Sequence, residues 1–280
     1  MGDALGAPIE FMSRNDIVRE FGESGVRSFA PQDDEESQSI GWVTDDTQMT
    51  LFTAEGLLRA MTRRQSRGIG GGSSVLLAHA YVRWYATQTQ PFPAETMDGF
   101  LVQQPWLFSQ RAPGRTVMAA LAANADVEFP RYKLGADNNS KGCGSVMRSA
   151  PFGLLADWKA GAMDAMDASF ITHGHRTASM SSAAFAAMIG LVVEGESIHG
   201  AVTGARSFIN GPYGNRSAQE TVAALDMAIA LSDTADISSA EAVESIGEGW
   251  VAEEALAIAA YSALAYPRED QVLDALSCAV

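Results

Sequence analysis

The sequence predicts a single all-α domain, and three observations support this prediction. Apolar residues recur at spacings of three and four in the longest regular segments, as they do along one face of an amphipathic helix. Alanine is abundant, whereas alternation of apolar and polar residues, the pattern of half-buried strands, is scarce. No linker rich in proline, glycine and serine separates segments of different composition, so the 280 residues, 47% of them hydrophobic, are expected to share one core.

Composition also argues against several classes of protein. The formal net charge of −15 disfavours nucleic acid as a partner, because binding a phosphate backbone requires a basic surface patch. Cys143 and Cys278 form neither a disulfide framework nor a paired zinc motif. The longest run of small or apolar residues, Ala183 to Val193, is shorter than the ~20 residues that span a membrane. The N-terminus carries no secretory or myristoylation pattern, so we expect a cytoplasmic protein without a membrane partner.

The first eleven residues, Met1 to Phe11, predict an irregular, tightly turned segment, because glycines flank an acid and a proline prevents a simple helix from continuing. Asp3 and Glu10 in this segment are either plain surface acids or members of a site formed with other acids. A short helix is predicted from Asn15 to Phe21. The four acids from Asp33 to Glu36 predict a solvated face rather than a site.

An acidic cluster opens the next helix, which is predicted from about Thr47 to Arg63. Its oxygen-bearing side chains are Thr44, Asp45, Asp46 and Thr47. In one interpretation Asp45 is the N-cap, Gln48 closes a capping-box-like pair, and the helix dipole favours Asp46. In the other, the cluster binds a hard cation, because Mg²⁺, Mn²⁺ and Ca²⁺ prefer carboxylate and hydroxyl oxygens. These residues alone leave both interpretations open.

Further helices follow at regular intervals. After a glycine-rich connection that ends at Ser74 as a predicted N-cap, a helix is expected from Val75 to Gln88, with His79 as a core or boundary residue. Four prolines then break a long irregular region. The later helices are predicted from about Thr177 to Glu194, from Ala252 to Leu264 and from Glu269 to Ala279, with capping boxes at Ser217 with Glu220 and at Ser238 with Glu241.

The polar, glycine-interrupted stretch from Asp137 to Arg148 has the chemistry of an anion-binding loop. Gly142 and Gly144 let backbone amides turn toward a ligand, and a following helix N-terminus adds positive potential for a phosphate. A structured loop without a ligand is the alternative. Cys143 is either a nucleophile, if a histidine lies nearby, or a small packing residue.

A third unusual stretch, Thr172-His173-Gly174-His175-Arg176, precedes the helix predicted from Thr177. Its two histidines are two residues apart, so they do not form the i,i+4 pair of a helical zinc site. We therefore expect at most one of them to be functional.

Taken in order, these motifs resemble the ADP-ribosylglycohydrolase family, especially its dinitrogenase-reductase-activating branch. The stretches that carry the resemblance are Gly2-Asp3-Ala4-Leu5-Gly6 with Glu10-Phe11, Thr44-Asp45-Asp46-Thr47, Asn138 to Arg148, Thr172-His173, and Gly249 to Leu256. They cover almost the whole chain. The resemblance implies an all-α orthogonal helical bundle with a two-metal Mg²⁺ or Mn²⁺ centre that cleaves the bond between ADP-ribose and a modified group.

The resemblance also implies a role for each of three groups of residues. The metal ligands it implies are Thr44, Asp45 and Asp46, and the catalytic residues are Glu10 and Asp46, with Glu10 over the scissile bond helping to activate water. The ligand-binding residues it implies are Asn138, Ser140, Lys141, Gly142, Gly144 and His173, of which those from Ser140 to Gly144 cradle the diphosphate and His173 contacts the ADP-ribose.

The chain departs from the family pattern in three places. The family has a helix before its Gly-Asp-Ala-Leu-Gly segment and an Asp-x-Asp-Ser/Thr metal motif after the helix that resembles Glu269 to Ala279, and neither lies within residues 1–280. We therefore expect one domain over residues 1–280 with half of the metal site. The Asp-x-Gly-Asn segment of arginine-specific members reads Ala112-Pro113-Gly114-Arg115 here, which leaves the acceptor atom open.

Three functions follow from these considerations. The first is a metal-dependent hydrolase of the glycosidic bond between ADP-ribose and a modified protein side chain or a related small-molecule acceptor. The second is a catalytically impaired ADP-ribose-binding or structural relative. The third is a thiol hydrolase that uses Cys143 with His173.

Overall fold

The computed structural model describes residues 1–30, 41–68, 73–94, 97–211, 215–234 and 238–280. These residues form thirteen α-helices and five short 3₁₀ helices and contain no β-strand, which confirms the all-α prediction. The α-helices are α1 (Gly2–Gly6), α2 (Arg14–Phe21), α3 (Asp45–Arg67), α4 (Ser74–Thr89), α5 (Arg115–Ala122), α6 (Ala150–Gly153), α7 (Trp158–Ser169), α8 (Arg176–Val193), α9 (Ile198–Asn210), α10 (Gln219–Ser232), α11 (Ser239–Ile246), α12 (Ala252–Ala265) and α13 (Val272–Ala279). The 3₁₀ helices are η1 (Leu101–Gln103), η2 (Pro105–Leu107), η3 (Cys143–Ser145), η4 (Asn215–Ala218) and η5 (Glu269–Gln271).

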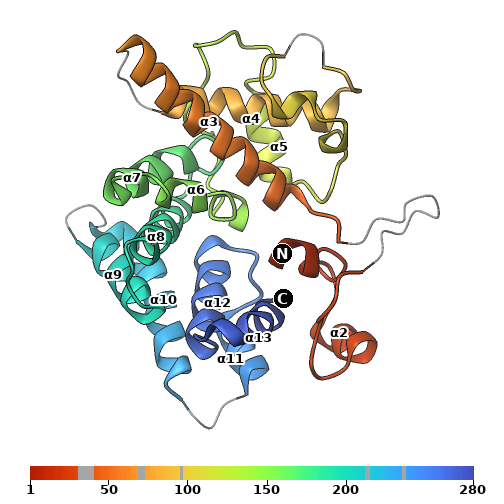
Figure 1. Cartoon of the computed structure of the whole chain (residues 1–280), viewed down its shortest axis with the longest axis vertical. Coiled ribbons are helices and arrows are strands. Elements are labelled where there is room, and N and C mark those ends of the chain that lie inside the picture. The colour runs from red at the N-terminus through yellow and green to blue at the C-terminus, as the bar shows by residue number, and fades with distance from the viewer. Residues whose placement is uncertain (31–40, 69–72, 95–96, 212–214, 235–237) are drawn as a thin grey trace.

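The helices follow one another through the molecule roughly in chain order (Figure 1). At one end α3 packs against α4, and α4 also contacts α5. In the middle α6 and α7 pack against α8, which contacts α9 on another side. At the other end α10 and α11 pack against α12, and α13 lies between α12 and α1. The acidic residues of α1 and α3 therefore meet between the two ends of the fold.

Helix α8 is the central element of the core, and small residues allow its neighbours to approach closely. A Cβ added at Gly190 would lie 2.2 Å from Trp158 Cβ, so α7 packs directly on the α8 backbone. A Cβ at Gly153 would lie 2.3 Å from the Ala186 carbonyl oxygen, which explains the close contact of α6. In the described part of the chain α8 alone is long and apolar enough to cross a membrane, yet 67% of it is buried within the protein. Most of the run from Ala183 to Val193 is thus part of a buried core helix, as its composition predicted.

The N-terminal segment corrects one prediction. Residues expected to be irregular form the one-and-a-half-turn helix α1, and the chain turns from residue 7 to residue 11. A second, smaller apolar cluster holds this segment, in which Leu5, Ile9 and Val26 are buried and Leu276 packs against them from α13. The Ser277 hydroxyl donates a hydrogen bond to the Val26 carbonyl oxygen at 2.7 Å. The two ends of the described chain consequently lie side by side (Figure 1).

The N-caps of α3 and α4 differ from the predicted ones. Thr44, not Asp45, is the N-cap of α3, because its hydroxyl accepts a bond from the Asp46 amide. Gln48 closes no capping box; its side-chain oxygen accepts a bond from Trp84 Nε1 at 3.0 Å instead. Helix α4 follows Ser73 as N-cap rather than Ser74. Tertiary partners explain the start of α3, since the Asp45 carboxylate accepts a bond from the Gly114 amide and the Gln48 oxygen from Trp84.

The two predicted capping boxes have different outcomes. The box of Ser238 with Glu241 is present at the start of α11 and is confirmed. The box of Ser217 with Glu220 is wrong, because Ser217 lies in η4 and the Glu220 carboxylate accepts bonds from other segments. The helix predicted from Glu269 divides into η5 and α13. The acids from Asp33 to Glu36 lie outside the described residues.

His79 is a boundary residue, as predicted. Its Nδ1 lies 2.6 Å from the Tyr132 hydroxyl and its Nε2 lies 2.9 Å from a carboxylate oxygen of Asp98. The same Asp98 joins an ion-pair network with Arg83 and Arg59 that connects α4 to α3. These contacts are structural and lie in the part of the fold built from α3 and α4.

Candidate active site

Asp3 anchors α1 to the start of α3. Its carboxylate accepts hydrogen bonds from the Thr44 amide at 3.0 Å, the Thr44 hydroxyl at 2.8 Å and the Thr47 amide at 3.1 Å. The Thr47 hydroxyl donates a further, short bond. A charged acceptor at the N-terminus of α3 satisfies amides that have no partner within that helix. Asp3 is therefore a partner of the acidic cluster and not a plain surface acid.

Asp45 and Asp46 lie beside this anchor in the first turn of α3. Asp45 is 4% exposed, its amide donates to the Arg111 carbonyl oxygen, and its carboxylate accepts a bond from the Gly114 amide at 3.3 Å. The Thr44 hydroxyl lies 2.9 Å from a carboxylate oxygen of Asp46 as well as close to Asp3. The three residues that the family resemblance assigns to metal binding are therefore neighbours in space.

The cluster brings Asp3, Glu10, Asp45 and Asp46 together without a basic partner among the described residues, which disfavours the charged forms of Glu10, Asp45 and Asp46. Burial and the adjacent Asp46 raise the pKa of Asp45 to about 8. Burial, Asp46 and Asp3 raise the pKa of Glu10 to about 7, and burial and Asp3 raise the pKa of Asp46. Among the described residues no lysine, arginine or histidine forms an ion pair with these four acids. A bound cation would relieve this repulsion.

The donor set suits a hard cation in chemistry but only partly in geometry. Carboxylate and hydroxyl oxygens are the ligands that Mg²⁺ and Mn²⁺ prefer. Within the described ranges, however, no group of three or more histidine, cysteine, aspartate or glutamate side chains converges as a metal-binding set. Thr44, Asp45 and Asp46 could therefore supply part of a coordination shell.

The loop from residue 138 to residue 145 is tied to the segment around His173. The Asn138 side-chain oxygen accepts bonds from the Ser140 and Gly174 amides, both at 3.0 Å, and its amide nitrogen donates to the Thr172 carbonyl oxygen at 2.9 Å. The Ser140 carbonyl oxygen accepts a bond from the His175 amide. Asn138 thus uses its whole side-chain amide within the protein, and its position is structural as well as adjacent to the predicted ligand-binding residues.

His173 packs directly on the two glycines of this loop. A Cβ at Gly142 would lie 3.5 Å from His173 Nε2, and a Cβ at Gly144 would lie 3.1 Å from His173 Cε1. The imidazole is 1% exposed, and burial together with Arg148 lowers the pKa of His173 to about 3. His173 is therefore neutral near pH 7. His175 is instead the N-cap of α8 and accepts a bond from the Thr177 amide.

Lys141 and Cys143 have partners that bear on their predicted roles. The Lys141 ammonium forms ion pairs with Glu253 and Glu220, so it already has two acidic partners. The Cys143 amide donates to the Trp250 carbonyl oxygen at 3.0 Å. Burial, Asp46 and Asp45 raise the pKa of the Cys143 thiol to about 12, so the thiol stays protonated near neutral pH. This argues against the thiol-hydrolase interpretation.

Sequence reasoning assigned no role to two groups that border the site. Arg148 is fully buried, its guanidinium donates to the Thr172 hydroxyl at 2.6 Å, and it lies over the Tyr81 ring. An arginine at the point where the polar stretch passes into the apolar residues of α6 was the available signal. The rings of Phe11 and Trp250 stack with their centroids 6.0 Å apart although the residues are distant in sequence, and no local pattern could have paired them.

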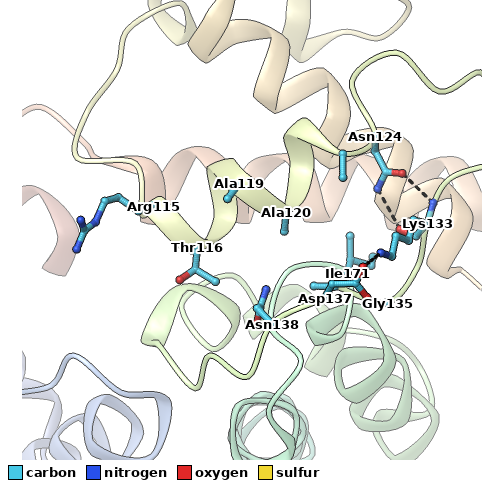
Figure 2. Close-up of a pocket in the computed structure, with 12 residues that line it drawn as sticks. Arg115, Thr116, Ala119, Ala120, Asn124, Lys133, Gly135, Asp137, Asn138 and Ile171 are labelled. Atoms are coloured by element: carbon cyan, nitrogen blue, oxygen red, sulfur yellow. Dashed lines mark hydrogen bonds and ion pairs between the residues drawn. The ribbon is translucent and has the colours of Figure 1, made fainter.

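A pocket of about 520 Å³ adjoins this loop (Figure 2). One wall is α5, with Thr116 and Ala120, and the opposite wall includes Asn138 and Ile171. The Thr116 hydroxyl lies 3.3 Å from the Ser140 hydroxyl, so the pocket reaches the predicted ligand-binding residues. Its volume is within the range of small-molecule sites. The acidic cluster does not line this pocket.

The model of the ADP-ribosylglycohydrolase family matches residues 1–280, which is the whole chain. No curated protein matches. Because the match spans every element described above, including α1, the start of α3 and the loop before α6, the chain belongs to the ADP-ribosylglycohydrolase family.

Proposed function

We propose that this protein is a divalent-metal-dependent hydrolase that cleaves the glycosidic bond between ADP-ribose and a modified protein side chain or related acceptor. Membership of a glycohydrolase family supports the reaction class. The observation that carries the proposal is the cluster of Asp3, Glu10, Asp45 and Asp46, in which burial and, after it, mutual repulsion raise the pKa values of Glu10, Asp45 and Asp46. Proteins retain such buried, unneutralised acids at functional sites more often than elsewhere.

In this proposal Thr44, Asp45 and Asp46 hold the cation, which is Mg²⁺ or Mn²⁺. When bound, such a cation orients water and ribose hydroxyls and offsets negative charge. Glu10 stands next to the cluster in the turn after α1 and exchanges a proton with the attacking water. Asp46 acts with Glu10 through its charge, because among the neighbouring carboxylates it raises the pKa of Glu10 the most.

In this proposal the diphosphate lies against the 140–145 loop at Ser140, Gly142 and Gly144. The Gly144 amide is the one that faces it, because the amides of Ser140 and Gly142 donate to the Asn138 side-chain oxygen and the Ser140 hydroxyl. His173 contacts the ADP-ribose from beneath this loop. The neutral state of His173 at pH 7 suits a hydrogen-bonding contact rather than a charge on phosphate. The pocket beside Asn138 and Ser140 offers room for part of the substrate.

The direct test is release of free ADP-ribose from an ADP-ribosylated protein and from a small-molecule conjugate, at increasing Mg²⁺ or Mn²⁺ and after chelation. We expect release that depends on the cation. Asp46→Asn should abolish most of this activity while the far-ultraviolet circular dichroism stays that of the wild type, because the change removes one anionic oxygen and little volume. Asp16→Asn is the matched control, since Asp16 also lies in a helix first turn but is distant from the cluster. Absence of release from both substrates at every cation concentration would contradict the proposal.

The second candidate is an ADP-ribose-binding relative with impaired catalysis. The absence of a converged set of three acidic, histidine or cysteine ligands in the described residues favours it. It predicts that calorimetry detects binding of free ADP-ribose while no substrate is cleaved. Calorimetry with Mn²⁺ adds a second criterion, because we expect at most one weakly held cation on residues 1–280.

A further inference from the structure

Lys141 lies where the N-terminal ends of three helices meet. Its Nζ is 3.0 Å from a carboxylate oxygen of Glu220, in the first turn of α10. It forms a second, shorter ion pair with Glu253, in the first turn of α12. The hydroxyl of Thr177, in the first turn of α8, donates to the same oxygen of Glu220 at 2.8 Å. One ammonium therefore connects three helices through two carboxylates.

Glu253 makes this connection energetically important. The Glu253 side chain is 9% exposed, whereas that of Glu220 is 53% exposed. Lys141 is the basic partner of Glu253 in the described part of the chain, and the second carboxylate oxygen of Glu253 has no hydrogen-bond partner there. Removing the ammonium would leave a buried carboxylate without its counter-charge, which proteins tolerate poorly.

The backbone of Lys141 contacts the same segment as its side chain. The Lys141 carbonyl oxygen accepts a bond from the Ala252 amide at 2.8 Å, and the Cys143 amide donates to the Trp250 carbonyl oxygen at 3.0 Å. These bonds make an isolated antiparallel bridge between Gly142 and Val251. The ion pair and the bridge act on one short stretch, so together they set the position of the 140–145 loop relative to α12.

The 140–145 loop lies between the acidic cluster and His173. Gly144 packs on His173, and a Cβ at this position would lie 3.0 Å from Val117. The Cys143 thiol is close enough to Asp45 and Asp46 for both to act on it. A shift of the loop would therefore change its distance from the acidic cluster and from the histidine at the same time.

We propose that Lys141 is a positioning residue, whose ammonium, held by Glu253 and Glu220, fixes the 140–145 loop so that the loop backbone rather than the lysine side chain faces the substrate. This assignment rests on the proposed function for its kinetic consequences. It refines the expectation that Lys141 is one of the residues that cradle the diphosphate, since its ammonium is already bonded to two carboxylates. The two roles make opposite predictions for Glu253→Gln. A positioning role predicts weaker binding of ADP-ribose. A phosphate-binding role predicts that the ammonium is released toward the phosphate and that ADP-ribose binds more tightly.

The first experiment is hydrogen exchange of the amides of residues 142–146, which requires no activity. We expect exchange about tenfold faster or more in Lys141→Met and in Glu253→Gln, because both remove the ion pair between Lys141 and Glu253. Lys141→Arg keeps a cation at this position and should show nearly wild-type exchange. Arg206→Met is the matched control, since it removes the exposed ion pair with Asp226 between α9 and α10 and should leave the loop unchanged. Wild-type exchange in Glu253→Gln would overturn the proposal. If Lys141→Met does not fold, Glu253→Gln and Lys141→Arg still decide the comparison.

The second experiment is a double-mutant cycle on ADP-ribose release and on binding of free ADP-ribose. Each of Lys141→Met and Glu253→Gln is expected to lower kcat/KM by about tenfold or more, and the double variant to be no worse than the poorer single variant. Additive losses, or ADP-ribose binding that tightens in Glu253→Gln, would overturn the proposal. If the wild type releases no ADP-ribose, the proposed function fails, while hydrogen exchange still decides the role of Lys141.

Discussion

The carboxylate of Asp3 accepts hydrogen bonds from both the amide and the hydroxyl of Thr44, at 3.0 and 2.8 Å. Thr44 is the N-cap of α3, and its hydroxyl also reaches Asp46. This contact fixes α1 at the start of α3 and gathers the acids of both segments in one place. The position of Glu10 therefore depends on an anchor seven residues before it.

We expect Asp3→Ala to weaken this anchor. The amides and hydroxyls of Thr44 and Thr47 would lose a charged acceptor, which costs about 1–3 kcal/mol of the free energy of unfolding. ADP-ribose release should fall as well, because the Glu10 segment is no longer held. Urea unfolding measures the first effect, with Ala in place of the exposed Glu23 as the control. Equal stability of the two variants would show that the contact contributes nothing.

Asp45→Asn should raise stability in the absence of metal ions. Burial and Asp46 raise the pKa of Asp45 to about 8, so folding holds this acid in an unfavourable environment that an amide does not experience. At pH 7.5 the difference between this pKa and the usual value of 3.8 corresponds to about 5 kcal/mol, which is an upper limit for the gain. Adding Mn²⁺ should raise the melting temperature of the wild type more than that of the variant. A variant that is less stable than the metal-free wild type would refute this account.

His173 should make the protein less stable as the pH falls below about 6.5. Its pKa is lowered to about 3 in the folded protein, whereas an unfolded histidine has a pKa near 6.5. Between these values the unfolded state binds more protons, so the free energy of unfolding decreases with falling pH by up to ~1.4 kcal/mol per unit.

His173→Gln should remove this decrease in the free energy of unfolding with falling pH. His199→Gln, a change at an exposed position, should keep it. Denaturant titrations at pH 7, 6, 5 and 4 measure both. The same slope in all three proteins would show that His173 is not the group responsible.

Gly144→Ala should disturb the loop on His173. The added Cβ would lie 3.0 Å from Val117 Cγ2 and 3.1 Å from His173 Cε1, closer than ordinary contacts, so one of them has to move. We expect the free energy of unfolding to fall by about 1–3 kcal/mol and the affinity for ADP-ribose to fall as well. Gly135→Ala is the control for stability, because no atom lies within 4 Å of a Cβ there. Unchanged affinity and stability in Gly144→Ala would remove the reason for a glycine at this position.

Local pattern predicted much of the secondary structure, and the error at Ser217 has a tertiary cause. The spacing of apolar residues located α3, α4, α8 and α12 to within a few residues. The box at Ser238 with Glu241 was correct, and the Glu241 carboxylate accepts bonds from the Ser238 amide and hydroxyl. The box at Ser217 failed because Glu220 has a stronger partner, Lys141, which is 79 residues away along the chain.

The residues alone predicted the helical class, the acidic start of α3, the glycine loop and the order of motifs that resembles the family. The folded arrangement was needed to show that Asp3 joins Asp46 through Thr44, and that His173 rather than His175 packs on the loop glycines. It also decided that Lys141 bonds Glu253, 112 residues away. The reason is physical: helix periodicity and caps depend on neighbours within about four residues, whereas buried charges take the partners that the packing of distant helices brings to them.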